Sequence, residues 1–314
     1  KNQARLNKIK KILLACLMFF SFPSQISARD SVKMAFVGDI LLAGQAGSIT
    51  LQKNDFSYPF AESAHILRTA DIAFGNLECV FSGDKVLRNV KGGGFVFKTP
   101  PRMAQALSWA VIDIVSLANN HALDGGVKGV TDTIATLEKF DIRYVGGGRN
   151  WAEARSLRII EIKEKKVGFL AFADLCNHQD CGASTQKAGI AMLKAETARA
   201  LTAVKTARKK TDILIVSVHW GVEYMPSPSE RQRKLARDFI DAGADIIIGH
   251  HPHVLQPIEF YKDRIIAYSL GNFVFDNPRL PQRKTMILQI EEKGGKFSYE
   301  TVSCLITNAQ PDCR

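Results

Sequence analysis

The sequence lacks the features that mark several common classes of protein. Only six of its 314 residues are cysteines, and none has the paired short spacing of a zinc finger. It has no helix-turn-helix signal and no basic stretch interleaved with aromatic residues, so we expect no nucleic-acid partner. No apolar run reaches the roughly 20 residues that a membrane-spanning helix needs. What is present, 46% hydrophobic and 23% charged residues, is the composition of a folded globular protein.

The first 28 residues predict an export signal. A positive region at 8–11 precedes an apolar stretch at 12–22, and the small residue Ala28 fits the position before a cleavage site. We therefore divide the chain into a signal peptide, 1–28, and one domain, 29–314. The protein is expected to be exported, either to the periplasm or to the cell surface.

Three alternatives to a cleaved signal remain open. The apolar stretch would serve as an uncleaved anchor, or it would form a buried amphipathic helix. Leu13-Leu14-Ala15-Cys16 loosely resembles a lipobox, which would place a lipid on Cys16.

Net charge is weak evidence for a partner. The formal charge is +11, but five of the 42 Lys and Arg residues lie in the first 28 residues, which contain no acid. In the rest of the chain, 37 basic residues therefore face 31 acidic ones. Such an excess permits an anionic partner but does not require one.

The cysteines of the predicted domain favour local disulfides, because export permits oxidation. Cys176 and Cys181 are close in sequence, as are Cys304 and Cys313, so each pair can close a short loop. Cys79 would then be the odd thiol.

From Val32 onward, short apolar runs alternate with amphipathic stretches. The expected strands are 33–37, 72–74, 112–116, 143–145, 157–162, 166–173, 213–218 and 246–248. Four expected helices are 61–69, 102–110, 128–140 and 196–210. A fifth begins after Ser227, which would be its N-cap, with Pro228 at the first helical position and Glu230 completing a capping box. Gly243 would end that helix. This alternation predicts a largely parallel sheet with helices on both faces.

The carboxyl-terminal part has a different pattern. Four strands joined by short turns are expected at 254–260, 264–269, 285–291 and 296–305, which suggests an antiparallel sheet. The predicted fold is a two-sheet α/β sandwich without a linker that would separate independent domains.

Polar residues follow five of the predicted buried strands. They are Asp39, then Asn76 and Glu78, then Asn120 and His121, then His219 and Glu223, and finally His250, His251 and His253. In open α/β sheets, ligands bind at the carboxyl ends of the strands. We therefore expect these side chains to meet at one edge.

Their chemistry suits a divalent metal such as zinc, manganese or iron. Each motif is weak alone, because Asp39 would fit a common turn, Asn120 would cap a helix and His219 would fit a hydrophobic core. Three imidazoles within five residues are harder to explain as packing. On an extended segment, His251 and His253 would also point the same way.

Six motifs in this order resemble the CapA/PgsA-type capsule-synthesis family within the calcineurin-like metallophosphoesterase superfamily. They are Phe36-Val37-Gly38-Asp39, Gly75-Asn76-Leu77-Glu78, Asn119-Asn120-His121, His219-Trp220-Gly221, Gly249-His250-His251-Pro252-His253-Val254 and Ser269-Leu270-Gly271-Asn272-Phe273. The resemblance covers roughly residues 32–280. It implies a calcineurin-like two-sheet sandwich and a part in poly-γ-glutamate or capsule biosynthesis.

The resemblance also implies roles for single residues. The positions matched to metal ligands are Asp39, Asn76, Glu78, Asn120, His219, His251 and His253. His121 matches the catalytic histidine that protonates the leaving group. The residues implied to support the site or to touch substrate are His250, Glu223 and Asn272.

Two departures from the superfamily pattern bear on the number of metal ions. Leu41 stands where a histidine ligand is usual, and the segment with Asn76 and Glu78 stands where a bridging aspartate is usual. The expected cofactor is therefore Mn, Fe or Zn, as one ion or as two with altered ligands.

Two functions remain open at this point. One is a metal-dependent, phosphoesterase-like hydrolase acting on an envelope phosphoester or on the γ-glutamyl polymer. The other is a non-catalytic factor that binds the anionic capsule polymer or a membrane-bound capsule synthase. A role in some other envelope task is the third interpretation.

Overall fold

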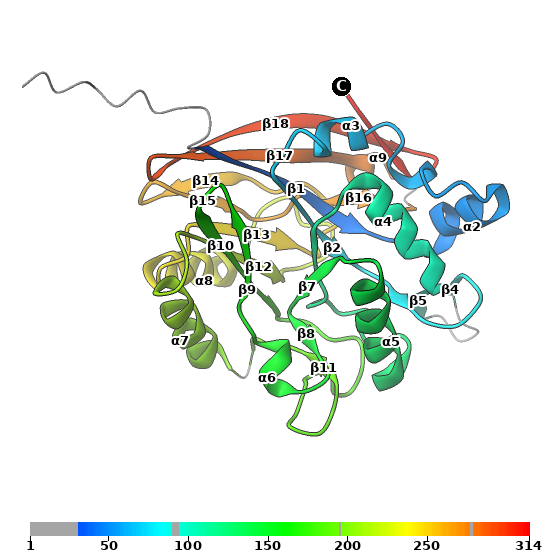
Figure 1. Ribbon diagram of the computed structural model, residues 1–314, viewed down its shortest axis with the longest axis horizontal. Coiled ribbons are helices and arrows are strands. Elements are labelled where there is room, and N and C mark those ends of the chain that lie inside the picture. Colours follow the sequence, from blue (N-terminus) through cyan, green and yellow to red (C-terminus); the bar gives the residue numbers. More distant parts are fainter. Residues whose placement is uncertain (1–30, 90–93, 195, 277–278) are drawn as a thin grey trace, which may run out of the picture.

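The computed structural model describes residues 31–89, 94–194, 196–276 and 279–314. The predicted signal peptide, 1–28, lies outside the described residues. Two β-sheets lie face to face, and helices cover their outer surfaces (Figure 1). This is the two-sheet α/β sandwich that the alternation of strands and helices predicted.

The first sheet is built around β1. Its strands, in spatial order, are β19 (Gln310–Cys313), β18 (Lys296–Thr307), β17 (Lys284–Lys293), β1 (Ser31–Ile40), β2 (Ile72–Leu77), β6 (Ile114–Ser116) and β7 (Arg143–Val145). β1 pairs with β2 in parallel and with β17 in antiparallel orientation, and the short β16 (Asn272–Val274) adds to its end. Nearly every residue of β1 is buried, as expected for a strand covered on both faces.

The second sheet has six strands. In spatial order they are β14 (Ile258–Tyr261), β15 (Arg264–Ala267), β13 (Ile246–His250), β12 (Ile213–His219), β10 (Lys165–Ala173) and β9 (Arg158–Ile162). β15 pairs with β13 in parallel. The carboxyl-terminal strands therefore do not form an antiparallel sheet of their own, contrary to the prediction. β14 and β15 belong to the second sheet, and β17 and β18 belong to the first. The edge of each sheet has backbone groups that need hydrogen-bond partners.

Two hydrophobic layers hold the sandwich together. Between the sheets, the rings of Phe74 and Phe169 stack with centroids 5.7 Å apart. Outside the second sheet, α7 (Thr197–Arg208) and α8 (Glu230–Asp241) pack on β12 and β13, where Phe172 and Phe239 stack. Each fully buried large side chain contributes about 1.5–3 kcal/mol of transfer free energy.

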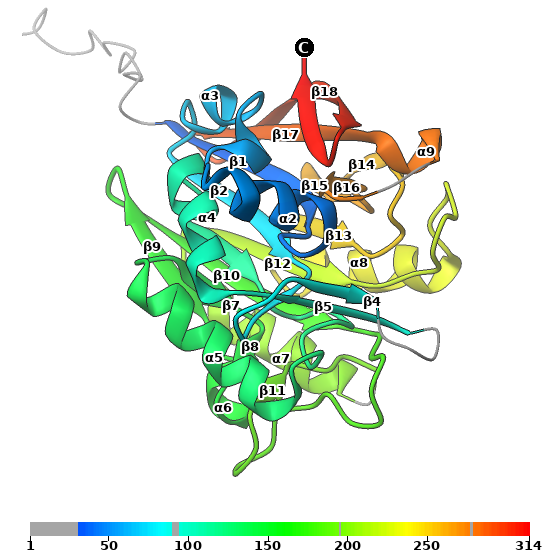
Figure 2. The same cartoon turned by 90° about the vertical axis from the view of Figure 1, so that its right-hand side faces the viewer.

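Most of the remaining elements are short, and one helix of 14 residues is the exception. The helices are α2 (Gly44–Lys53), α3 (Ala64–Leu67), α4 (Ala104–Ala110), α5 (Gly126–Lys139), α6 (Trp151–Ala154) and α9 (Leu280–Arg283). The small sheets are β3 (Val80–Phe81) with β5 (Phe95–Thr99) and β4 (Leu87–Asn89), and β11 (Gly189–Ile190) with β8 (Gly147–Gly148). The sequence did not predict α2, since Gly44 and Gly47 lower its helix propensity. It lies on the same side of the molecule as β4 and β5 (Figure 2).

The start of α8 differs from the prediction by two residues. Ser229, not Ser227, is its N-cap, and Gln232, not Glu230, completes the capping box. Both pairs have the spacing of a capping box. The later pair forms because the Gln232 amide is buried and also donates to the Gln256 side chain.

The predicted cysteine pairing is confirmed. Cys176 bonds to Cys181 and Cys304 to Cys313, which leaves Cys79 as the free thiol among the described residues. Burial raises the pKa of the Cys79 thiol to about 12, so it is unreactive.

Across the parts of the chain that the structure describes, no helix combines the length and apolar character needed to cross a membrane.

Candidate metal centre

The strand ends that carry the predicted site residues meet where the two sheets face each other. In the first sheet, Asp39 is in register with both Asn76 and Asn272. In the second, His219 is in register with His250. All five are nearly inaccessible to solvent.

Glycine permits two close approaches between neighbouring chain segments at the site. A Cβ atom on Gly38 would lie 2.0 Å from the carbonyl oxygen of Gly271, and one on Gly249 would lie 1.9 Å from that of Tyr268. Real Cβ atoms cannot approach a carbonyl oxygen so closely. The glycines that precede Asp39 and His250 therefore allow the site to assemble.

Asp39 is the centre of the contacts in the first sheet. Its Oδ1 accepts a hydrogen bond from Asn76 Nδ2 at 2.8 Å and lies 3.3 Å from His250 Nδ1. Its Oδ2 lies 3.4 Å from His253 Nδ1. Asn76 therefore orients the Asp39 carboxylate.

Glu78 is the observation that most strongly indicates a cation. Its side chain is fully buried, and in the described part of the chain neither carboxylate oxygen has a hydrogen-bond partner. Glu78 Oε1 lies 3.7 Å from His253 Nε2 and 4.0 Å from His121 Nε2. A buried carboxylate whose oxygens accept no hydrogen bond is costly, and a bound metal ion would offset that cost.

Two groups of side chains have the spacing of metal ligands. One consists of Asp39, Glu78 and His253, and the other of Glu223, His251 and His253. Within each group the ligand atoms lie within 4.8 Å of one another. Both groups include His253, whose Nδ1 faces Asn272 and whose Nε2 can bind only one ion, so the groups mark two adjacent cation positions that compete for one imidazole. Oxygen and nitrogen donors fit Mn, Fe or Zn.

Asn120 and His219 stand beside the second group. His219 Nε2 lies 2.9 Å from Asn120 Oδ1, and the rings of His219 and His251 are 4.9 Å apart. Asn272 holds His253 in place, because its Oδ1 lies 2.8 Å from His253 Nδ1. An imidazole oriented through one nitrogen presents the other to a metal.

The histidine pair converges by a different geometry from the one predicted. His251 and His253 have φ values of 97° and 57°, so the segment is a tight turn and not extended. Their ring centroids nevertheless lie 5.8 Å apart. Non-glycine residues with such φ values are strained, and they cluster at functional sites.

His121 lies at the rim of the centre with a fixed ring orientation. Its Nδ1 is 2.7 Å from Asp124 Oδ2, and its ring stacks on Phe97 at 4.0 Å. A carboxylate only accepts hydrogen bonds, so His121 Nδ1 carries the hydrogen and Nε2 faces Glu78. The sequence analysis missed Asp124, although its position three residues after His121 is a usable signal.

The charges in the centre depend on one another. Burial alone would raise the pKa of Asp39, but contacts with His250 and His253 hold it well below its usual range. Burial, and next the Asp39 charge, raise the pKa of Glu78 well above its usual range. Burial opposes the protonation of His253, yet Glu78 and Asp39 raise its pKa to about 10. Without metal, His253 therefore carries the positive charge that balances Asp39.

Two further buried histidines, His219 and His251, remain neutral and suited to metal binding. Burial, and next the neighbouring His251, lower the pKa of His219 well below its usual range. Burial, and next His253, lower the pKa of His251 to about 3. Neutral imidazole is the form that binds metal.

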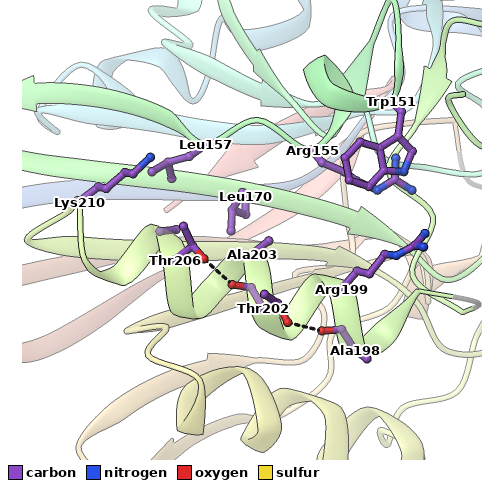
Figure 3. Close-up of a pocket in the computed structure, with 11 residues that line it drawn as sticks. Trp151, Arg155, Leu157, Leu170, Ala198, Arg199, Thr202, Ala203, Thr206 and Lys210 are labelled. Carbon is purple, nitrogen blue, oxygen red and sulfur yellow. Dashed lines mark hydrogen bonds between the residues drawn. The ribbon is translucent and has the colours of Figure 1, made fainter. Parts of the chain in front are cut away.

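A hollow elsewhere in the described part of the chain does not contain the site. It has a volume of 580 Å³ and lies along α7, with Trp151 and Arg155 at one end and Lys210 at the other (Figure 3). None of the residues described as lining it is a histidine or carries a carboxylate.

Replacing Glu78 by Gln should stabilise the metal-free protein near neutral pH. Because the folded-state pKa of Glu78 is raised, its contribution is fully present below pH 4.5 and is lost as pH rises toward the folded-state pKa. Glu78→Gln keeps the shape without this penalty, so we expect a gain of about 1–3 kcal/mol at pH 7.5. Thermal unfolding in EDTA, as a function of pH, measures it.

The same Glu78→Gln variant should lose most of the stabilisation that added Mn²⁺ gives the wild type. Glu223→Gln is the matched control, because Glu223 is exposed. It should weaken Mn²⁺ stabilisation without raising metal-free stability. A Glu78→Gln variant less stable than wild type in EDTA would contradict the claim that the buried Glu78 carboxylate destabilises the metal-free fold.

The sequence is similar to proteins of capsule biosynthesis. The family described as bacterial capsule synthesis protein PGA_cap matches residues 33–277. The chain is 34% identical over 285 residues to PGA biosynthesis protein CapA of Bacillus subtilis (strain 168), covering 90% of this chain and 73% of that one. It is 34% identical over 256 residues to capsule biosynthesis protein CapA of Bacillus anthracis, covering 81% of this chain. That alignment spans 62% of the relative, less than two thirds of its length.

One solved structure shows the same fold. A hypothetical protein from Thermus thermophilus superposes with a TM-score of 0.52 and 14% sequence identity, covering 87% of this chain and 99% of that one.

Proposed function

Because the chain belongs to the bacterial capsule synthesis protein family PGA_cap, we propose that it is an exported, metal-dependent hydrolase of capsule or poly-γ-glutamate biosynthesis. Its substrate is a phosphoester of the envelope or the anionic capsule polymer itself. The observation that carries the proposal is the buried Glu78 carboxylate, which has no hydrogen-bond partner among the described residues and stands beside Asp39 and His253.

The proposed ligands follow from the two groups of side chains. Asp39, Glu78 and His253 would hold one divalent cation, and Glu223 and His251 would hold a second with neighbouring side chains, because the free nitrogen of His253 binds only one ion. The neighbouring ligand candidates are Asn120 and His219. When bound, such a cation supplies Lewis acidity, which polarises the scissile bond and eases the ionisation of water near neutral pH.

The chain's own residues would do the remaining work. Asn76 and Asn272 fix the orientations of Asp39 and His253. His121, when protonated, would donate the proton on Nε2 to the leaving group as a general acid, an oxygen in a phosphoester and a nitrogen in the γ-glutamyl polymer. Asp124 holds the Nδ1 hydrogen and stabilises the imidazolium before transfer. His250 packs against Asp39 and supports it.

The test combines metal content with a substrate panel. We expect the purified chain, loaded with Mn, Fe or Zn, to retain one or two ions and to hydrolyse an aryl phosphomonoester, an aryl phosphodiester or γ-linked polyglutamate. A fully metal-loaded protein that hydrolyses none of them would overturn the hydrolase and favour the non-catalytic alternative, a factor that binds the polymer or a membrane-bound synthase. A protein that retains no metal after reloading would overturn the metal centre as well.

A further inference from the structure

A short loop closed by a disulfide reaches the rim of the metal centre. It follows β10, whose last residue pairs in register with His219. The disulfide joins Cys176 to Cys181. Before the loop, the backbone N–H of Asp174 donates to the His219 carbonyl at 2.9 Å, and Arg231 of α8 pairs with the Asp174 side chain at 2.9 Å. The loop is thus attached to the second sheet at the strand that carries His219.

Asn177, inside this loop, contacts the two residues of the Asn120–His121 pair at once. Its Oδ1 accepts a hydrogen bond from Asn120 Nδ2 at 3.2 Å, and its Nδ2 lies 3.3 Å from His121 Nε2. Its backbone N–H donates to the Asn120 carbonyl at 3.4 Å. The next residue, His178, lies 3.0 Å from Asp124 Oδ1.

The contact with Asn120 decides which end of that amide faces the metal centre. A side-chain amide has a donor end and an acceptor end, and only the oxygen can bind a metal ion. With Nδ2 donated to Asn177, the oxygen of Asn120 is turned toward His219 Nε2, 2.9 Å away. The loop therefore selects the orientation that presents a ligand oxygen.

The contact with His121 gives the second ring nitrogen, Nε2, a hydrogen-bond partner. Because Nδ1 carries its hydrogen toward Asp124, Nε2 of the neutral ring is an acceptor. The Asn177 Nδ2 group is the donor that faces it. One amide thus satisfies both His121 and Asn120, which lie 56 and 57 residues away in sequence.

We propose that Asn177 is a positioning residue that sets the Asn120 amide and the His121 ring, and that the Cys176–Cys181 disulfide holds it in place. Asn177 is exposed, and its loop has no regular secondary structure to fix it. The cross-link reduces the conformations of such a loop. The consequence for catalysis rests on the proposed function, whereas the side-chain orientation does not.

The experiment separates orientation from catalysis by using the metal-free protein first. Ring ¹⁵N spectra of histidine-labelled protein, assigned with a His121→Gln variant, report the His121 tautomer and the hydrogen bond at Nε2. We expect the His121 Nε2 signal to shift in Asn177→Ala and in the double variant Cys176→Ser/Cys181→Ser. It should stay unchanged in Cys304→Ser/Cys313→Ser, which removes the other disulfide, and in Gln186→Ala, which removes an exposed amide.

Mn²⁺ titration by calorimetry then tests the effect on Asn120. Loss of a residue that orients a ligand typically costs 10–100-fold in affinity, so we expect Asn177→Ala to weaken Mn²⁺ binding about tenfold. Asn177→Asp keeps the acceptor for Asn120 and should keep wild-type affinity, while it lacks the donor for His121 and should still shift its signal.

The outcomes are distinct. An unchanged His121 signal in both Asn177→Ala and the double cysteine variant would overturn the positioning role, whatever the metal does. A wild-type protein that neither binds Mn²⁺ nor hydrolyses substrate would overturn the proposed function, and the spectra would still decide the role of Asn177.

Discussion

Replacing His253 by Gln is expected to remove nearly all bound metal and all hydrolysis. His253 is the one side chain shared by the two groups of metal ligands, so its loss leaves each with two members. Loss of a mere supporting residue costs about 10–100-fold in metal affinity. We expect a larger loss for a direct ligand that belongs to both groups, with Mn²⁺ binding too weak for calorimetry and metal content near zero by mass spectrometry.

The same variant needs a control for folding, because His253 also balances a buried charge. Removing one partner of a buried ion pair costs about 3–5 kcal/mol, and here the pair is His253 with Asp39. Circular dichroism at low temperature shows whether the variant is folded. His65→Ala removes an exposed histidine of α3 and should leave metal content unchanged.

Glu223→Gln gives a second measurement that does not depend on the buried pair. It alters only the group with His251, so we expect it to lose one of two ions and to keep the other. If His253→Gln bound as much metal as the wild type, the proposed metal centre, in which His253 is a ligand, would be refuted. If Glu223→Gln lost no ion, the cation position beside Glu223 and His251 would be refuted, and the one beside Asp39 and Glu78 would remain.

The sequence predicted which strand ends converge within each sheet, because parallel strands bring their carboxyl ends to one edge, but strand register does not explain why the ends of two facing sheets meet. Asp39 and Asn76 come together by the register of β1 and β2, and His219 and His250 by that of β12 and β13. Register between strands follows from alternating or continuous apolar patterns, which are local and visible in sequence.

The finer geometry could not be predicted, because it depends on contacts between distant segments. The sequence offered Asn76 as a poorer bridge than a carboxylate and Glu78 as its substitute, but it did not show what either side chain contacts. The structure shows that Asn76 hydrogen-bonds to Asp39, whereas Glu78 has its oxygens unpartnered among the described residues. The loop that carries Asn177 has no periodic pattern, and nothing local connects it to His121.

The turn at the histidine motif illustrates a second limit. An alternating pattern predicts the direction of side chains only where the backbone is extended. His251 and His253 instead adopt positive φ values that sequence preferences disfavour for such residues. Strain of this kind is imposed by the surrounding fold, and propensities therefore miss it.

Replacing His121 by Gln should lower kcat by about 100–1,000-fold while leaving metal content unchanged, which is the lower part of the range expected for a general acid. His121 belongs to neither group of metal ligands, yet its Nε2 lies 4.0 Å from Glu78 at the edge of the centre. Steady-state kinetics with wild-type and variant proteins, each checked for metal content, measure the effect.

The leaving group separates an acid from a structural residue. An aryl phosphate whose phenolate departs readily needs little proton donation, whereas an alkyl phosphate needs the proton in the transition state. The loss for His121→Gln should therefore be at least about tenfold larger with the alkyl ester, as expected when only one substrate depends on general acid catalysis. His178→Ala, which removes the exposed histidine on the other oxygen of Asp124, should show no such dependence. Equal losses on both esters would show that His121 acts on the shape of the centre and not on the leaving group, since a misplaced metal ligand slows both reactions alike.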